Sequence, residues 1–359
     1  MNTYRIAVIP GDGIGPEVVA EGLRVLRAVG GADAGFSLEL EELPWGSAYH
    51  DRHGRMMPGE AISTLRAFDS IYFGAVGRPD LPDDLTVWGL ILPLRRELDL
   101  YVNLRPVRLY PGVPTPLRSE VGEPRLTFVR ENTEGEYAGL GGRQGQGEHE
   151  LAVQTGMFTR RGIRRVVEYA FSLAAPGTLV TSVTKSNALR HAFTLWDEVA
   201  AEVAARHPDV RFERMHVDAV AYQLVRNPAR FGVLVGSNLF GDILTDLGAA
   251  LQGSLGLAAS ANLCPGQRLA LFEPVHGSAP DIAGQGKANP LGAVACAALM
   301  LAHLGEREAA GRIERAIEEV TRQGVFTPDL GGTSTTREVG DALLAALERG
   351  GRAAAKGAT

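Results

Sequence analysis

Two aspartates four residues apart, Asp242 and Asp246, are the clearest chemical signal in the sequence, in the run Ser-Asn-Leu-Phe-Gly-Asp-Ile-Leu-Thr-Asp. This spacing places both carboxylates on one face of a helix. Acids are favoured at helix N-termini in any case, which explains Asp242 but not a like charge one turn later. Paired oxygen ligands suit Mg²⁺ or Mn²⁺, ions that take further ligands from water and substrate. Asp218 is a candidate third ligand, although a helix cap explains it equally well.

Three arginines, Arg95, Arg105 and Arg130, each stand beside an apolar run that should partly bury them. Solvation at the surface is the ordinary role of any single arginine. Planar guanidinium groups are, however, the donors that a site for two carboxylates requires. Arg105 and Arg130 also lie at predicted strand ends, where α/β proteins form binding sites. The series therefore indicates a dicarboxylate ligand.

Tyr137 and Lys185 are residues of the types that move protons in active sites. A lysine can accept a proton near arginines and a metal, and a tyrosine can pass one on. Either residue alone is more often structural or simply exposed. Their spacing does not show that the two side chains meet.

Two glycine-rich segments could approach a nucleotide. The turn Gly11-Asp12-Gly13-Ile14-Gly15 follows a strand and opens a helix, but Pro16 stands where the dinucleotide fingerprint needs its last glycine. A tight turn explains these glycines almost as well. The second segment, 272–289, strings His, Ser, Asp and Asn through small residues, and a carboxylate such as Asp281 can accept from a ribose 2′-hydroxyl. An irregular surface loop is its alternative.

Strand-like and helical segments alternate along the chain, which indicates an α/β protein. We expect strands at 4–10, 70–76, 125–131, 178–184, 211–217, 232–238 and 268–274. We expect helices at 16–29, 58–67, 159–174, 189–205, 239–252, 289–304 and 307–322. The polar, Gly-rich span 143–151 is predicted to be a projecting arm or subunit contact.

The 359 residues are 45% hydrophobic and 22% charged, a composition that suits about two globular domains. The net charge of −6, without a basic run, disfavours a nucleic acid partner. No apolar stretch reaches the ~18 to 20 residues that a membrane span needs. The start shows no signal peptide, and Cys264 and Cys296 are expected to be free thiols. We therefore expect a cytoplasmic protein.

Taken together, the motifs resemble the β-decarboxylating dehydrogenase family, which includes isocitrate, 3-isopropylmalate, homoisocitrate, and tartrate or D-malate dehydrogenases. The similarity runs from about residue 4 to residue 340, with every motif in family order. It implies an isopropylmalate dehydrogenase-like α/β fold that differs from the Rossmann fold. It also implies a first domain of 1–100 plus 253–359, an inserted second domain of 101–252, and a homodimer with shared active sites.

The resemblance also implies roles for individual residues. The three arginines would hold substrate carboxylates, Asp242 and Asp246 would bind Mg²⁺ or Mn²⁺, and Tyr137 would be the acid. Lys185, as the base, and Asp218 would come from the partner subunit. NAD would be the cofactor, since Asp281 and Ile282 look like the NAD form of the loop, and a K⁺ requirement stays open. The implied cofactor-binding residues are Asn187, His276, Gly277, Ser278, Ala279, Asp281, Ile282 and Asn289.

The substrate is expected to be small. In this family the turn before Arg95 contacts the C3 substituent, and here Trp88 could fill the space of an isopropyl group. This favours D-malate or tartrate, oxidised at the 2-hydroxyl and then decarboxylated. Leu90 and Pro93 depart from that branch, and Pro93 is expected to interrupt the helix and shift the turn. 3-Isopropylmalate, or another 3-substituted malate, is therefore the alternative substrate.

The same residues disfavour two other classes of protein. A non-catalytic regulatory subunit of a heteromeric dehydrogenase should lack some of Tyr137, Lys185 and the aspartates, yet all are present. A binding module for anionic metabolites would not need paired metal aspartates. Both alternatives are disfavoured.

Overall fold

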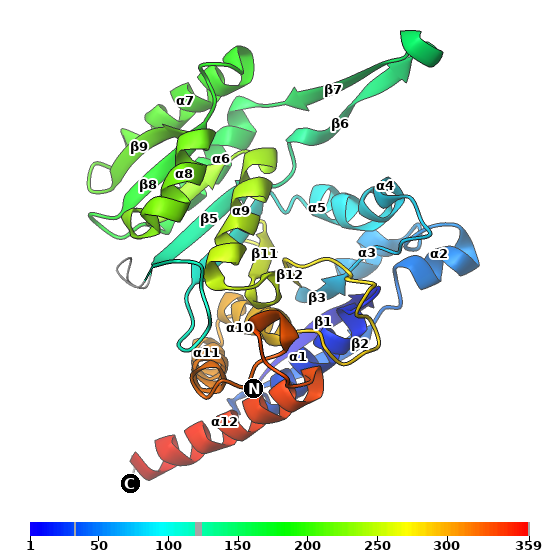
Figure 1. Cartoon of the computed structure of the whole chain (residues 1–359), viewed down its shortest axis with the longest axis vertical. Coiled ribbons are helices and arrows are strands. Elements are labelled where there is room, and N and C mark those ends of the chain that lie inside the picture. The colour runs from blue at the N-terminus through cyan, green and yellow to red at the C-terminus, as the bar shows by residue number, and fades with distance from the viewer. Residues whose placement is uncertain (32–33, 119–123, 358–359) are drawn as a thin grey trace. The chain divides into compact units, whose positions relative to one another are not determined.

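The computed structural model describes residues 1–31, 34–118 and 124–357 (Figure 1). The chain divides into two compact units. The terminal unit contains both chain ends and consists of Met1–Leu98, Leu109–Pro116 and Ala249–Thr359. The middle unit consists of Asp99–Arg108 and Leu117–Gly248. The chain therefore passes between the units several times.

The strands of the terminal unit are hydrogen-bonded in the order β2-β1-β3-β12-β11. β1 runs parallel to β2 and β3, β12 runs parallel to β3, and β11 is antiparallel to β12. Every residue of β3 is buried, as expected for a central strand with both faces covered. The strands are β1 Asn2–Gly11, β2 Phe36–Glu42, β3 Ser70–Ala75, β11 Ala259–Leu263 and β12 Leu271–Pro274.

Helix α10 is the central helix of the terminal unit. Its sequence is apolar almost throughout, and it packs against the sheet and against helices α1 and α11. α12 in turn packs along α1 and α11 (Figure 1). The helices are α1 Gly15–Val29, α2 Ser47–His53, α3 Ala61–Leu65, α4 Asp83–Thr86, α5 Leu92–Glu97, α10 Leu291–His303, α11 Arg307–Arg322 and α12 Thr336–Gly357.

The predicted interruption at Pro93 is wrong, because the helix continues through it. Between α4 and α5 the chain forms a π-helical turn, η2, over Val87–Ile91, in which the amide of Leu92 donates to the carbonyl of Val87. A proline ring in an α-helix clashes with the carbonyl four residues before it and cannot donate a hydrogen bond. One extra residue in the preceding turn avoids that clash, so the helix widens at this point.

The strands of the middle unit follow the order β4-β5-β10-β8-β9, antiparallel at β4–β5 and parallel elsewhere. They are β4 Val102–Arg108, β5 Arg125–Glu131, β8 Leu179–Thr184, β9 Arg211–His216 and β10 Val233–Gly236. The helices are α6 Arg160–Ser172, α7 Arg190–Ala204, α8 Val217–Arg226 and α9 Asn238–Gln252. Because β5, β10 and β8 are parallel, their carboxyl ends meet at one edge of this sheet.

A separate two-stranded ribbon extends from the middle unit (Figure 1). It consists of β6 Gly135–Gln144 and β7 Leu151–Met157, with a 3₁₀ turn, Gly147–His149, at its tip. All of β7 and most of β6 are exposed. The predicted arm at 143–151 is thus the end of this ribbon. Within the described ranges, no helix is both long enough and apolar enough to cross a bilayer.

Candidate active site

Five of the predicted site residues lie together at the carboxyl edge of the middle sheet. We call Arg105, Arg130, Tyr137, Asp242 and Asp246 the arginine–aspartate cluster. β10 ends at Gly236, which is paired in register with Arg130 on β5, and α9 begins two residues later. The first turns of α9 therefore start beside the end of β5. The helical spacing then directs both aspartates to this edge.

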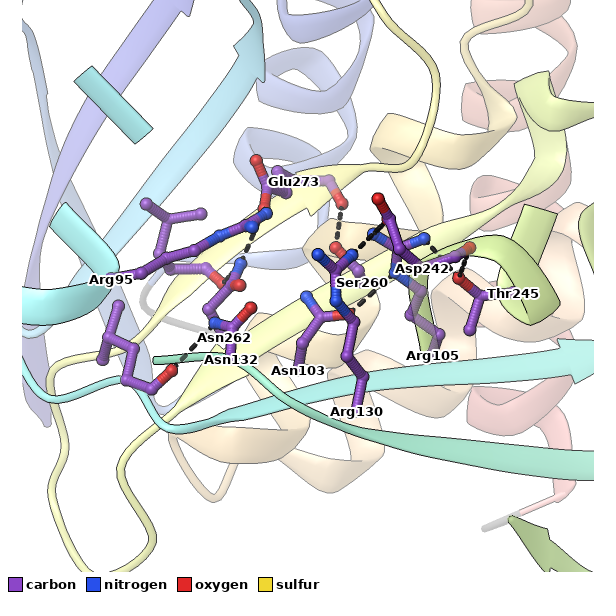
Figure 2. A network of polar contacts seen from close by, with 12 residues as sticks. Arg95, Asn103, Arg105, Arg130, Asn132, Asp242, Thr245, Ser260, Asn262 and Glu273 are labelled. Atoms are coloured by element: carbon purple, nitrogen blue, oxygen red, sulfur yellow. Dashed lines mark hydrogen bonds and ion pairs between the residues drawn. The ribbon is translucent and has the colours of Figure 1, made fainter. Parts of the chain in front are cut away.

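Arg130 anchors the cluster and is 2% exposed. Its Nε and one terminal nitrogen donate to Asn238 Oδ1 at 3.0 and 2.7 Å. The other terminal nitrogen pairs with Asp242 (Figure 2). A Cβ at Gly241 would lie 2.6 Å from Arg130 Cγ, so only glycine leaves room for the arginine stem. A buried guanidinium requires such partners, because an unpaired charge there is strongly unfavourable.

Arg105 lies between the two aspartates. It is 7% exposed, and its Nε donates to Asn103 Oδ1 at 2.7 Å. Its two terminal nitrogens are each 3.6 Å from an aspartate, one from Asp242 Oδ1 and the other from Asp246 Oδ1. Partial desolvation raises the pKa of Asp246, the like charge of Asp242 adds to this rise, and Arg105 opposes it. Both carboxylates nevertheless keep solvent access, and the Asp246 side chain is 61% exposed.

Tyr137 is bound to the same cluster. Its hydroxyl donates to Asp242 Oδ2 at 3.0 Å, and the Arg130 guanidinium lies 5.6 Å from its ring centroid. The sequence did not indicate this contact, because β6 and α9 are far apart along the chain. A potential proton donor thus lies within one hydrogen bond of a potential metal ligand.

Lys185 and Asp218 form a pair of their own. Lys185 Nζ donates to Asp218 Oδ1 at 2.6 Å, and this bond is the main cause of the lowered pKa of Asp218. In the part of the chain that the structure describes, no three His, Cys, Asp or Glu side chains are grouped to hold a metal ion. Asp218 therefore does not join Asp242 and Asp246 within one chain. Asn187 is exposed in the turn after β8, two residues beyond Lys185.

Arg95 belongs to the terminal unit, where it is buried on α5. One of its terminal nitrogens donates to Glu273 Oε1 at 2.8 Å, and Asn262 Nδ2 donates to the same oxygen at 2.8 Å (Figure 2). Its Nε is buried without a hydrogen-bond partner. Glu273 and Asn262 were not predicted as site residues, since nothing in their spacing links them to Arg95.

The loop between β12 and α10 encloses a cavity of about 560 Å³ in the terminal unit. This volume is within the range of small-molecule sites. Of the predicted cofactor residues, His276, Gly277, Ala279, Ile282 and Asn289 line it, and Ser278 and Asp281 belong to the same loop. Lining residues that sequence reasoning missed are Ile14, Ser254, Leu255, Gly256, Lys287, Ala288, Pro328 and Asp329.

The two glycine-rich segments of the sequence meet at this cavity. The amide of Ile14 donates to the carbonyl of Ser278 at 2.8 Å. A Cβ at Gly13, where φ is +58°, would lie 2.0 Å from that same carbonyl oxygen. Gly13 therefore allows the two backbone segments to approach closely, in addition to forming a tight turn. On the far side, Asn289 Nδ2 donates to Asp329 Oδ2 at 3.0 Å.

His276 provides a test of whether the cavity suits an adenosine. Its Nδ1 is 2.9 Å from the carbonyl of Gly277, while its Nε2 is buried and has no partner. Burial lowers the pKa of His276, so the ring is neutral at pH 7. A neutral imidazole with an unused nitrogen, among apolar and small residues, suits a heteroaromatic base that offers hydrogen bonds.

Residues 5–343 match the isocitrate/isopropylmalate dehydrogenase family. The chain belongs to that family. It is 50% identical over 361 residues to the decarboxylating D-malate dehydrogenase of Escherichia coli K12, covering 97% of this chain and 100% of the relative. It is 49% identical over 352 residues to a probable tartrate dehydrogenase/decarboxylase of Agrobacterium vitis, covering 97% of both chains.

A solved structure of this family agrees with the fold. The crystal structure of isocitrate dehydrogenase from Methylococcus capsulatus superimposes with a TM-score of 0.88 at 38% identity, covering 96% of this chain and 99% of that chain. The family, its α/β fold and the oxidoreductase class predicted from the motifs are thereby confirmed. The relatives from E. coli and A. vitis carry the names of decarboxylating dehydrogenases.

Proposed function

We propose that the protein catalyses the metal-dependent, NAD-linked oxidative decarboxylation of a small 2-hydroxy dicarboxylic acid. D-malate, converted to pyruvate and CO₂, and tartrate are the preferred substrates, as the names of the relatives suggest. The observation that carries the proposal is the arginine–aspartate cluster, where two buried guanidinium groups, two solvent-accessible carboxylates and a tyrosine hydroxyl meet. A cytoplasmic location is part of the proposal on the sequence grounds above.

The arginines would bind the carboxylates of the substrate. Arg105 lies 3.6 Å from each aspartate, and one of its terminal nitrogens donates to Thr245 Oγ1 at 2.5 Å. A substrate carboxylate would be the planar partner that a guanidinium binds through charge-assisted, bidentate hydrogen bonds. Arg130 would contribute beside it, and Arg95 is assigned by the family pattern. Trp88, 41% exposed, would limit the room at C3.

Asp242 and Asp246 would hold Mg²⁺ or Mn²⁺. They supply oxygen ligands on one helical face, which fits a hard divalent ion, and Asp218 of a second copy would complete the set. When bound, the ion polarises the 2-hydroxyl and stabilises the negative charge that loss of CO₂ leaves on the substrate.

Lys185 and Tyr137 would move the protons. Lys185 Nζ accepts the proton of the 2-hydroxyl as the hydride leaves C2, and the β-carboxylate of the resulting keto acid departs as CO₂. Tyr137 then delivers its hydroxyl proton to the carbon that carried this carboxylate. The hydrogen bond from Tyr137 to Asp242 fixes the position of that hydroxyl.

NAD would bind through its adenosine in the cavity of the terminal unit, with His276, Asn289 and Ile14 around the base. Asp281 would accept from the ribose 2′-hydroxyl and repel a 2′-phosphate, and Asn187 is assigned by the family pattern. When bound, NAD⁺ supplies the acceptor for the hydride.

A homodimer with shared sites is part of the proposal. Supporting it, a single chain keeps Lys185 and Asp218 apart from the metal aspartates. Exposed apolar side chains also gather on the ribbon and on α8 and α9, as interfaces require: Leu140, Leu151, Val153, Tyr222, Val225 and Ile243.

Mixing two inactive variants tests the shared site. Lys185→Met and Asp242→Asn chains, co-expressed, should regain about a quarter of wild-type activity, because half of the dimers are mixed and each has one intact site. Each variant alone should be inactive. A mixture as inactive as its parents would place the whole site in one chain.

A substrate panel tests the reaction itself. D-malate, L-tartrate, 3-isopropylmalate and isocitrate are compared by kcat/KM with NAD⁺ and Mn²⁺, with and without a chelator. D-malate or tartrate should be preferred, and chelation should abolish turnover until metal is restored. If 3-isopropylmalate wins by orders of magnitude, the alternative substrate is correct, and turnover that survives complete chelation would refute the metal mechanism.

A further inference from the structure

The π-helical turn before Pro93 determines which arginine meets Trp88. In an α-helix, two turns take ~7 residues, so Trp88 and Arg95 would share a face. With one extra residue in the π turn, two turns take ~8 residues, and Arg96 takes that place. The structure agrees, since the Arg96 guanidinium lies 5.0 Å from the Trp88 ring centroid, while Arg95 is turned to the buried Glu273.

The π turn also packs closely against other residues of the terminal unit. Leu90 and Ile91 are buried, and a Cβ at Gly89 would lie 2.7 Å from Cγ of the buried Met56. The Trp88 side chain, in contrast, is 41% exposed. The indole is thus large, exposed and in contact with a cation on one side. Such a side chain can limit the space beside a bound ligand.

We infer that Arg96 is a positioning residue for substrate selection, acting through Trp88. The extra residue of the π turn, caused by Pro93, brings the guanidinium onto the indole, and this cation–π contact holds the indole where it excludes substituents at C3 of the substrate. The inference rests on the proposed function, which assigns Trp88 to the substrate, and adds Arg96 and Pro93 as the residues that set its position.

Replacing the cation tests the contact. Arg96→Met keeps a long side chain but removes the charge, and Arg96→Lys keeps the charge. In Arg96→Met the ratio of kcat/KM for 3-isopropylmalate to that for D-malate should rise about 2- to 5-fold, the range expected for an exposed cation–π contact. Arg96→Lys should restore most of the wild-type ratio. An unchanged ratio in Arg96→Met, with D-malate turnover retained, would overturn the inference.

A double-mutant cycle with Pro93→Ala tests the origin of the contact. Alanine restores the amide and removes the ring, so the turn can return to α-helical spacing and carry Arg96 off the indole. Pro93→Ala should therefore relax selectivity as Arg96→Met does, and the double variant should be no more relaxed than either. Additive effects would show that Pro93 and Arg96 act separately.

Tryptophan fluorescence gives a readout that does not depend on turnover. The chain has three tryptophans, and Trp45 and Trp196 are only 5% and 0% exposed. Quenching by acrylamide therefore reports mainly on Trp88, with Trp88→Phe as the blank. The Stern–Volmer constant should rise in Arg96→Met and in Pro93→Ala but not in Arg96→Lys. If wild-type protein turns over none of the acids, the proposed function fails, while equal quenching in all four proteins rejects the Arg96 contact itself.

Discussion

The arginine–aspartate cluster and the cavity of the terminal unit are built on different principles. The cluster consists of two arginines and two aspartates of opposite charge, joined by the tyrosine hydroxyl of Tyr137, with the arginines buried and the aspartates partly exposed. The cavity is shaped by backbone, where a glycine turn and a loop of small residues meet. Most of its lining residues are apolar or glycine, and burial lowers the pKa of His276, which favours the neutral ring.

This difference predicts that the two regions respond to different kinds of substitution. In the cluster, removing one charge takes an ion-pair partner from a buried arginine, so side-chain identity matters most. At the cavity, the spacing of two backbones matters most, so an added methyl group does more harm than a lost polar atom. Three variants, in order of expected effect, can separate the two cases.

The largest effect is expected for Asp242→Asn. The variant loses a proposed metal ligand and weakens the ion pair with Arg130. Turnover should fall by more than about 100-fold, beyond what loss of an outer-shell partner causes, and the Mn²⁺ concentration for half-activation should rise. The free energy of unfolding should fall by only about 1–2 kcal/mol, because the aspartate is partly exposed and solvent screens the pair.

Asp209→Asn is the matched control, since it makes the same change at an exposed position of the middle unit. It should leave both activity and stability within experimental error. Wild-type metal activation in Asp242→Asn would show that the aspartates serve only to hold the arginines.

An intermediate effect is expected for Gly13→Ala. The new Cβ would meet the Ser278 carbonyl at 2.0 Å, and φ at this position is +58°. The loop must move, so KM for NAD⁺ should rise about 10-fold and the unfolding free energy should fall by about 1–3 kcal/mol. Gly350→Ala in α12, where a Cβ meets nothing within 4 Å, is the control. An unaltered KM for NAD⁺ would mean that this contact does not shape the cavity.

Local patterns predicted much of the fold. The strands β1, β3, β5, β8, β9, β10 and β12 begin and end within a few residues of the predicted segments, because runs of β-branched residues are bounded by turn residues. The bounds of β4 were not predicted, because Pro106 and flanking arginines break its pattern, although every residue of it pairs with β5. Arg105, predicted to lie at a strand end, instead lies in the middle of β4, paired with Phe128. α12 was missed because its glycines weaken helical propensity, while packing on α1 and α11 stabilises it.

The site was predictable only where its residues are close in sequence. The four-residue spacing of Asp242 and Asp246 gave their common face directly. The approach of Tyr137 to Asp242, and of Ile14 to Ser278, depends on tertiary packing that no spacing encodes. The sequence indicated that Pro93 would disturb the helix but not how. A helix break and a π turn both relieve the clash between the proline ring and the preceding carbonyl, and the structure has the π turn.

The smallest effect is expected for His276→Gln, measured as a pH dependence. The folded protein holds His276 with a lowered pKa, chiefly because burial disfavours the charged ring. Its contribution to stability is complete above the unfolded value of about 6.5 and is lost as the pH falls through the interval down to the lowered folded value. Wild-type protein should therefore lose stability between pH 7.5 and 5.5, by urea denaturation, more steeply than His276→Gln. His149→Gln, on the exposed tip of the ribbon, should keep the wild-type slope. Equal slopes for wild type and His276→Gln would mean that the cavity accommodates the charged imidazolium. The cavity would then be more polar than the comparison with the arginine–aspartate cluster assumes.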